Sequence, residues 1–179
     1  MSTALDVRPT AAEYPTFYAR YIDPLPDAPI LDVLERQVAE TAALLESIGE
    51  ANAAYRYAPG KWSVKEVAGH VADVERIFCV RALRFARGDA TPLPGFEQNA
   101  YVANAGFDRQ PLARLVDALR TARASALALF RSLDDDALRR RGTAASGEFC
   151  VRAIAWIIAG HQAHHVRVLE ERYLPGLSE

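Results

Sequence analysis

The amino-acid sequence predicts an all-α protein built from four long amphipathic helices. Apolar residues recur every three or four positions over four stretches of the chain, which is the period of one helix face. Prolines and most glycines fall between these stretches, and no segment convincingly predicts a strand. We therefore expect one domain over residues 1–179, large enough to bury a core without disulfide bonds.

The first helix is predicted from about Ile30 to Ile48, after a leader of residues 1–29. Its apolar stripe consists of Leu31, Leu34, Val38, Leu45 and Ile48. Because proline disfavours helix continuation, the leader should be set apart by Pro24, Pro26 and Pro29. The segment Tyr14 to Ile22 is rich in aromatic residues, and we expect it to pack as a short helix across the bundle.

The second helix is predicted to begin at Ser63 and to continue to about Arg87, before Gly88. Ser63 and Glu66 have the spacing of a capping box, in which each side chain accepts a hydrogen bond from the backbone N–H of the other residue. A long connection then runs from Gly88 to Gln110. A connection of that length is able to cross a bundle, whereas a tight turn would force the two helices to be neighbours.

The third and fourth helices complete the predicted set. The third starts near Pro111, a favoured first-turn residue, and reaches about Leu133, with a stripe of Leu112, Leu115, Leu119, Leu127 and Phe130. The fourth runs from about Cys150 to Tyr173, and we expect it to be stopped by Pro175 and Gly176.

Composition and charge narrow the classes of function. A formal net charge of −2 and a pI near 6.1 give no electrostatic reason to expect nucleic acid or an anionic membrane as a partner. The most apolar stretch, Val151 to Gly160, is too short for a membrane span and contains Arg152. The opening residues predict no signal peptide, and two cysteines make no disulfide framework, so we expect a cytoplasmic protein.

Three of the four histidines fall on apolar helix faces. His161 and His165 are one turn apart on the fourth helix, so both imidazoles can reach one point beside it. His70 lies between Val67 and Val74 on the second helix and also faces inward. A lone inward histidine is more often a core residue bonded to a carbonyl. A pair with a third histidine instead favours a divalent metal that accepts the nitrogen lone pairs.

Two further residues are candidates for roles beside this site. His164 points about 100° away from His165 around the helix, so we interpret it as a flanking residue and not a ligand. Asp73, three residues after His70, either orients that imidazole or holds metal-bound water as a neighbouring carboxylate, or it pairs with Arg76 on the surface. The sequence leaves these alternatives for Asp73 equally open.

Several familiar metal and phosphate motifs are absent from the sequence. It contains no His-Glu-x-x-His, no Glu-x-x-His, no glycine-rich phosphate loop and no cysteine pair with zinc-ribbon spacing. A mononuclear site with neutral ligands remains. Three neutral imidazoles leave the charge of a divalent cation uncompensated, so we expect it to favour an anionic ligand such as hydroxide or thiolate.

Three motifs, taken in order along the chain, resemble those of the DinB/YfiT superfamily. They are YAPGKWSVKEVAGHVAD at residues 57–73, ARGDATPLPGF at residues 86–96 and AGHQAHH at residues 159–165. The resemblance covers the chain from about Tyr14 to Tyr173. It implies an antiparallel four-helix bundle, with the long connection crossing between the second and third helices. It also implies a mononuclear zinc or nickel site formed by His70, His161 and His165.

The resemblance also implies possible functions. Characterised relatives include transferases and isomerases that use low-molecular-weight thiols, so one expectation is a metal-dependent enzyme that activates a thiol or a water. Its partners would be a small-molecule thiol or an electrophile, with no nucleic acid and no membrane. Another expectation is a metal-stabilised bundle without turnover and with a stress-related binding role. In either case the resemblance implies a homodimer, the commonest closed oligomer.

Overall fold

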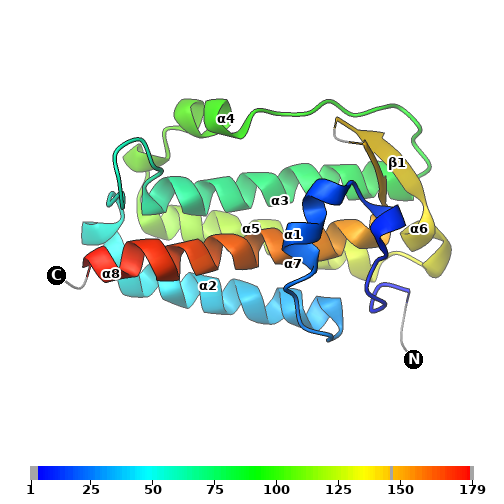
Figure 1. The fold of residues 1–179 in the computed structure, drawn as a ribbon, viewed down its shortest axis with the longest axis horizontal. Coiled ribbons are helices and arrows are strands. Elements are labelled where there is room, and N and C mark those ends of the chain that lie inside the picture. The colour runs from blue at the N-terminus through cyan, green and yellow to red at the C-terminus, as the bar shows by residue number, and fades with distance from the viewer. Residues whose placement is uncertain (1–3, 146, 178–179) are drawn as a thin grey trace.

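Four long helices form the body of the protein, as the sequence predicts (Figure 1). The structure is a computed structural model that describes residues 4–145 and 147–177. The long helices are α2 (Ile30–Asn52), α3 (Val64–Ala86), α5 (Leu112–Arg131) and α7 (Val151–Val168). None of the helices in these residues is both long and apolar enough to cross a membrane.

The four helices are arranged so that α2 and α3 lie diagonally opposite each other. Each of them packs mainly against α5 and α7. One apolar cluster joins the last turns of α2 and the segment after α7 to the first turns of α3 and α5, so α3 and α5 run in the same direction. The predicted antiparallel arrangement therefore holds for α2 beside α5 and for α3 beside α7. It does not hold between α3 and α5 or between α2 and α7, because each of these neighbouring pairs runs in the same direction.

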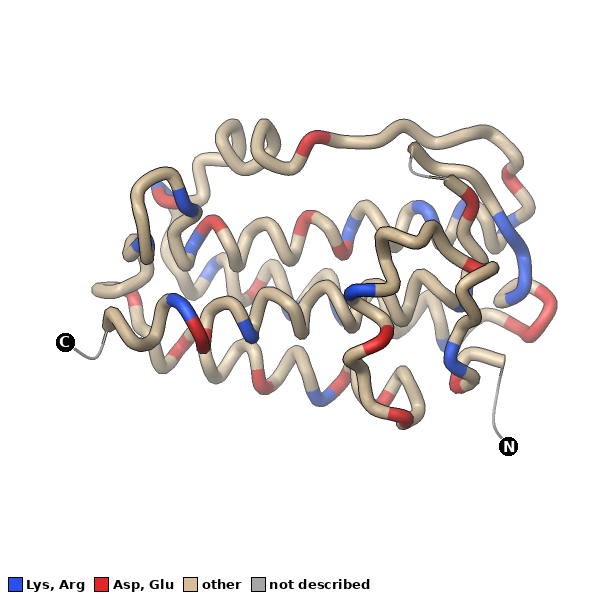
Figure 2. Tube along the Cα trace, viewed as in Figure 1, with Lys and Arg blue, Asp and Glu red and all other residues tan. Residues whose placement is uncertain are grey.

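The segment between α3 and α5 explains this parallel pair. It returns along the length of the bundle and carries α4 (Gln98–Ala105) and the short turn Phe107–Arg109 (Figure 1). Figure 2 shows that this connection carries few charged residues, whereas both signs of charge alternate along the bundle helices. The connection therefore runs along the side of the bundle and joins the end of α3 to the start of α5.

A β-hairpin precedes α7, and the expectation that the chain has no strand was wrong. After the short helix α6 (Asp135–Arg139), the strands β1 (Arg141–Ala144) and β2 (Gly147–Cys150) pair antiparallel, with Arg141 opposite Cys150. Each strand has only four residues, which is too few for an alternating pattern to stand out in the sequence. Gly142 of β1 lies against the Phe85 ring, and a Cβ at this position would come within 2.0 Å of that ring.

The end of the last helix also differs from the prediction. A π-helical turn, Leu169–Tyr173, follows α7, and α8 (Leu174–Leu177) continues past Pro175 and Gly176. Pro175 lies within α8, directly after the π-helical turn, and the helix does not end at this residue. Gly176 lies against the Tyr55 side chain, because a Cβ there would come within 2.0 Å of the hydroxyl oxygen. Close packing, and not a helix stop, explains Gly176.

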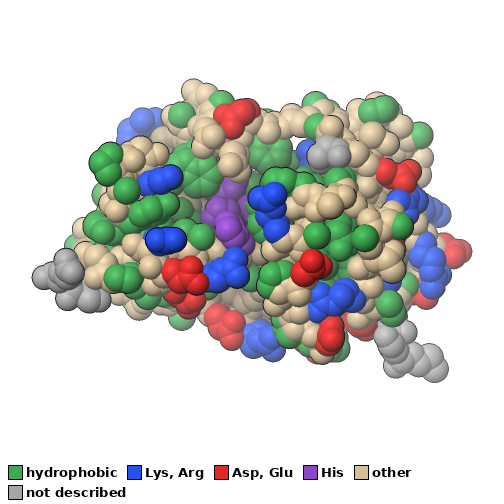
Figure 3. Space-filling model, viewed as in Figure 1, with side chains coloured by type: hydrophobic (Ala, Val, Ile, Leu, Met, Phe, Trp, Pro, Cys, Tyr) green, Lys and Arg blue, Asp and Glu red, His purple; other side chains and the backbone are tan. Residues whose placement is uncertain are grey.

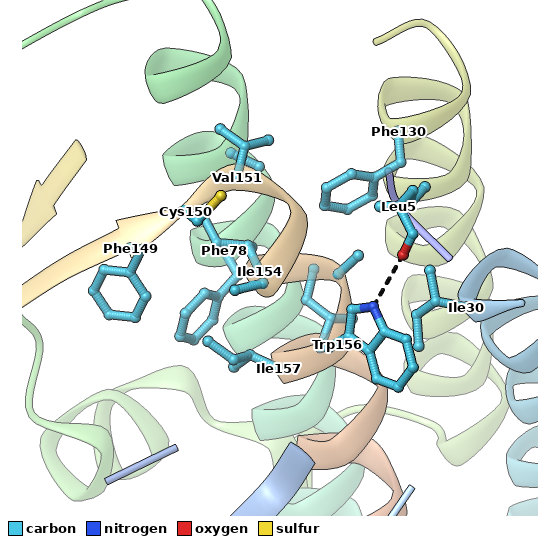
Figure 4. Packing of buried hydrophobic residues seen from close by; sticks show 14 of the residues in the cluster. Leu5, Ile30, Phe78, Phe130, Phe149, Cys150, Val151, Ile154, Trp156 and Ile157 are labelled. Atoms are coloured by element: carbon cyan, nitrogen blue, oxygen red, sulfur yellow. Dashed lines mark hydrogen bonds between the residues drawn. The ribbon is translucent and has the colours of Figure 1, made fainter. Parts of the chain in front are cut away.

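The leader packs across the bundle, as expected. Its helix α1 (Ala19–Ile22) lies against α7 (Figure 1). Trp156 is buried in the core of Figure 4 and donates a hydrogen bond from its indole Nε1 to the carbonyl oxygen of Leu5 at 3.0 Å. Arg152 donates from Nε to Glu13 at 2.6 Å. Residues near the start of the chain are therefore tied to the first turns of α7 by buried polar contacts as well as by apolar packing.

A buried polar network joins all four long helices. Arg123 of α5 is completely buried and donates two hydrogen bonds to Glu75 of α3, at 2.6 and 3.0 Å. It also donates to the Leu34 carbonyl of α2 at 2.6 Å and to the Gln162 side chain of α7. Gln162 in turn donates to Thr41 at 2.6 Å. The network satisfies the buried ion pair with hydrogen bonds and links all four long helices.

The predicted capping box at Ser63 is confirmed. The Ser63 hydroxyl accepts from the Glu66 backbone N–H at 3.0 Å, and Glu66 accepts from the Ser63 backbone at 2.8 Å. The same hydroxyl donates to Asp108 at 2.5 Å, which ties the start of α3 to the connection.

We predict that Ser63→Ala lowers the free energy of unfolding by about 1–2 kcal/mol, with or without metal. Urea denaturation measures this; Ser63→Thr is the control, and an unchanged midpoint for Ser63→Ala would contradict the cap.

Candidate metal centre

Three histidines converge between α3 and α7. The Nε2 atom of His161 lies 3.2 Å from Nε2 of His70 and 3.2 Å from Nε2 of His165. Ligand-capable nitrogens of all three lie within 4.8 Å of one another, and this is the group of possible metal ligands found in the described residues. The structure thus brings together the three residues that the sequence predicts as metal ligands.

Two of the three nitrogen separations match a tetrahedral metal site. Zinc binds imidazole nitrogen at about 2.0–2.1 Å, so two ligands at tetrahedral corners are about 3.3 Å apart. The observed 3.2 Å separations between His161 and each of its two neighbours fit that geometry. The donor set consists of neutral nitrogens, which suits zinc, nickel or another borderline divalent cation. The residues present therefore fit the predicted group.

Burial keeps these imidazoles in the form that binds metal. It lowers the pKa of His70 to about 4 and that of His165 to about 3, and the nearby His70 and His164 contribute further at His165. Burial is also the largest cause of the lowered pKa of His161, followed by the neighbouring histidines. All three side chains are thus uncharged at neutral pH, with a lone pair available on each ring.

Two glycines, each next to a histidine in sequence, let other segments approach α3 and α7 closely. Gly69 precedes His70, and a Cβ at that position would lie 2.4 Å from the Phe107 ring. Gly160 precedes His161, and its Cβ would lie 2.0 Å from the backbone oxygen of Tyr21. The Ala-Gly-His triplets of α3 and α7 therefore share one physical role. In each, the missing side chain admits a segment from outside the four long helices.

We predict that Gly160→Ala loosens the leader from α7. Alanine ordinarily favours a helix over glycine by up to about 1 kcal/mol, so a simple propensity effect would stabilise the protein. Here the new methyl group must displace the Tyr21 backbone. A net loss of about 1–3 kcal/mol and faster proteolysis of the leader are expected. A higher melting temperature with unchanged cleavage would contradict the close contact.

The site opens into a cleft of about 440 Å³. Figure 3 shows histidine side chains at the bottom of a hollow on this face of the molecule, with hydrophobic groups around them. His165 is half-buried and lines the cleft, whereas His70 and His161 lie deeper. The Trp62 ring lies 4.6 Å from the His70 ring and forms part of the wall. Other lining residues are Tyr57, Lys61, Gln98, Asn99, Val168 and Tyr173.

His164 and Asp73, the two candidates for roles beside the site, are not part of the group of converging ligand atoms. His164 lines the cleft, with its ring 5.1 Å from that of His165 and 5.5 Å from that of Tyr21. This is the flanking position expected for it. Asp73 accepts a hydrogen bond from Arg76 at 2.9 Å, so the structure realises the surface ion pair and does not bring Asp73 to the histidines. A short i,i+3 pair on an exposed face satisfies the carboxylate locally.

The sequence reasoning missed the aromatic and amide residues that line the cleft. Trp62 lies in a recognised motif, but nothing in its spacing indicated that its ring packs on His70. Arg123 was also missed, although a signal was present. It falls on the same stripe of α5 as Leu119 and Leu127, where a charged residue predicts a buried partner.

A family model for the DinB superfamily matches residues 33–169. The chain belongs to the DinB superfamily. This DinB protein is similar in structure to YfiT from Bacillus subtilis, described as "a probable metal-dependent hydrolase with an unusual four-helix bundle topology". The match has a TM-score of 0.72 and 19% sequence identity, and it covers 79% of this chain and 82% of YfiT.

A second similar structure is a mycothiol-dependent maleylpyruvate isomerase. The TM-score is 0.66 and the identity 18%, with 82% of this chain covered but only 61% of the isomerase. No curated protein matches the chain in sequence. At these identities the two structures establish that the DinB protein shares their fold.

Proposed function

We propose that this DinB protein is a metal-dependent enzyme that activates a low-molecular-weight thiol or a water molecule. The observation that carries the proposal is the convergence of His70, His161 and His165 at the inner end of an open cleft. When bound there, a divalent cation would supply Lewis acidity and favour the deprotonated form of a thiol or a water. The similar structures, one a probable hydrolase and one a thiol-dependent isomerase, support the same two chemistries.

The openness of the site supports an enzyme over a purely structural metal. Structural zinc sites are closed by four protein ligands, whereas catalytic sites keep a position open. Here the described residues offer three ligands, and the third of them, His165, borders the cleft. A volume of about 440 Å³ is within the usual range of small-molecule sites. We infer that a small molecule reaches the open position through this cleft.

The residues of the cleft would then orient that small molecule and shield it from bulk water. Trp62 and Tyr57 provide flat apolar surfaces, and the amides of Gln98 and Asn99 offer hydrogen bonds from the α4 side. Lys61 adds a positive charge at the exposed rim, which would favour an anionic or polar substrate tail. These groups position a ligand, and the three histidines hold the cation.

We predict that small thiols bind the metal-loaded protein and not the metal-free protein. Calorimetry with a panel of cellular thiols at two pH values measures this. Binding as thiolate releases a proton, so the apparent affinity should rise with pH until the free thiol itself titrates. Turnover is expected only when an electrophile is added.

His161→Ala, which removes the central ligand, is the control for binding through the metal. Equal binding of thiols to the wild type and to this variant would contradict the thiol proposal. If thiols bind neither protein while the metal-loaded wild type hydrolyses activated esters or amides, the water-activating form of the proposal is the better account.

A further inference from the structure

A second pocket lies along α3, away from the histidines. It has a volume of about 350 Å³ and lies between the exposed side of α3 and the start of the long connection. Arg81 at this pocket follows His70 by eleven residues, which is about 16 Å along the helix. The pocket shares no lining residue with the histidine cleft. Most of its wall is apolar or aromatic: Ile77, Val80, Leu93, Pro94, Phe96 and Tyr101.

Arg81 is the unusual residue of this pocket. Its side chain is buried, with 4% of the residue exposed, and it forms no ion pair among the described residues. Its two arginine neighbours in the pocket are different, because Arg76 pairs with Asp73 at 2.9 Å and Arg84 pairs with Asp89 at 2.6 Å. The pocket therefore contains one buried positive charge that no carboxylate of the described chain balances.

The Arg81 guanidinium is held in place while donors remain free. Nη2 donates to the Pro94 carbonyl at 3.3 Å, and the Tyr18 side chain is a further hydrogen-bond partner. The guanidinium carbon lies 4.9 Å from the centre of the Phe78 ring and 5.9 Å from that of Phe96. A guanidinium carries five N–H groups, and these two acceptors do not occupy all of them, so N–H groups remain for a ligand in the pocket. Burial lowers the pKa of Arg81, as expected of a cation without a counter-charge.

The far wall of the pocket is also fixed. The backbone N–H of Leu93 donates to the Thr143 carbonyl of β1 at 2.9 Å, which ties the connection to the hairpin. The rings of Phe96 and Tyr101 lie 5.2 Å apart and form an aromatic surface opposite α3. A preformed apolar pocket with one polar anchor is the usual design of a small-molecule site.

We propose that this pocket binds an aromatic or branched aliphatic monocarboxylate, whose carboxylate pairs with Arg81. The planar guanidinium matches a carboxylate through two parallel hydrogen bonds, and the low-dielectric surroundings strengthen them. The hydrocarbon part of the ligand lies against Val80, Phe96 and Tyr101. The pocket has one positive charge without a counter-charge, so its ligand carries one carboxylate. A second carboxylate would lie against the apolar wall without a counter-charge.

Calorimetry with 3-phenylpropionate and its amide tests the proposal on metal-loaded wild-type protein. The acid should bind and the amide should bind at least on the order of tenfold more weakly, because only the acid pairs with the guanidinium. The same preference should persist in His161→Ala, which separates this pocket from any carboxylate bound at the metal. Loss of the preference in that variant, or equal binding of acid and amide, would overturn the proposal.

Two pairs of variants locate the site. Arg81→Gln should weaken the acid by on the order of tenfold or more, whereas Arg84→Gln, whose arginine is already paired with Asp89, should not. Ile77→Glu places a carboxylate one turn before Arg81, where it should pair with the guanidinium and prevent binding. Ile77→Gln is its matched control. If Arg81→Gln does not fold, the Ile77 pair still decides: equal binding by both Ile77 variants refutes the site.

Discussion

His161→Ala is expected to lose most of its bound divalent metal and to unfold at a lower temperature than the wild type. The Nε2 atom of His161 lies 3.2 Å from those of both His70 and His165, so its removal leaves two ligands without the central one. A ligand that binds only the folded state stabilises it, by about 2.7 kcal/mol when its concentration is one hundred times its Kd. Elemental analysis of protein purified without a nickel-affinity step, together with thermal unfolding, measures both effects.

His164→Ala is the matched control for that variant. His164 lies beside the ligand group and lines the same cleft, but its nitrogens are outside the converging set. The His164→Ala variant should therefore retain its metal. A chelator should lower its melting temperature, as we expect for the wild type. Unchanged metal content in His161→Ala, or loss in His164→Ala alone, would show that the ligand set is wrong.

Arg123→Met is expected to cause the largest loss of stability among substitutions outside the metal centre. The variant leaves Glu75, which is 2% exposed, as a buried carboxylate without its partner. It also removes the donors to Leu34 and Gln162. Breaking a buried ion pair on one side typically costs about 3–5 kcal/mol. Chemical denaturation measures the free energy of unfolding.

The double variant Glu75→Leu with Arg123→Met tests the cause of that loss. Apolar residues at both positions leave no uncompensated charge, so the double variant should be more stable than Arg123→Met alone. Arg120→Ala is the surface control. Its pair with Glu46 is half exposed, and its loss should cost at most about 1 kcal/mol. A double variant less stable than Arg123→Met would show that packing, and not the unpaired charge, dominates.

Local patterns in the sequence were sufficient to locate the long helices and to select the three histidines that converge. The apolar period located the four long helices, and the spacing of Ser63 and Glu66 located the start of α3 within one residue. His161 and His165 share a helix face by spacing alone, and His70 was placed on an apolar face of another helix. These inferences succeeded because each depends on residues within one or two turns of the same helix.

Other features depend on contacts between distant parts of the chain, and only the tertiary structure decided them. The sequence did not show that α3 and α5 run parallel, because that follows from the path of the connection along the bundle. It left Asp73 with two roles, which the ion pair with Arg76 resolved. Side chains from several elements form the cleft beside His165. Side chains from several elements also line the pocket that contains Arg81.

The physical reason for this division is the range of the interactions. Helix spacing and capping are set by backbone hydrogen bonds over three or four residues, so the amino-acid order alone determined them here. Glu75 and Arg123 are 48 residues apart, and neither side chain by itself indicates which partner neutralises it. The sequence determined which side chains of this protein can bind a metal or carry a charge. The tertiary structure decided which of them meet, and which of them, like Arg81, have no carboxylate beside them in the described residues.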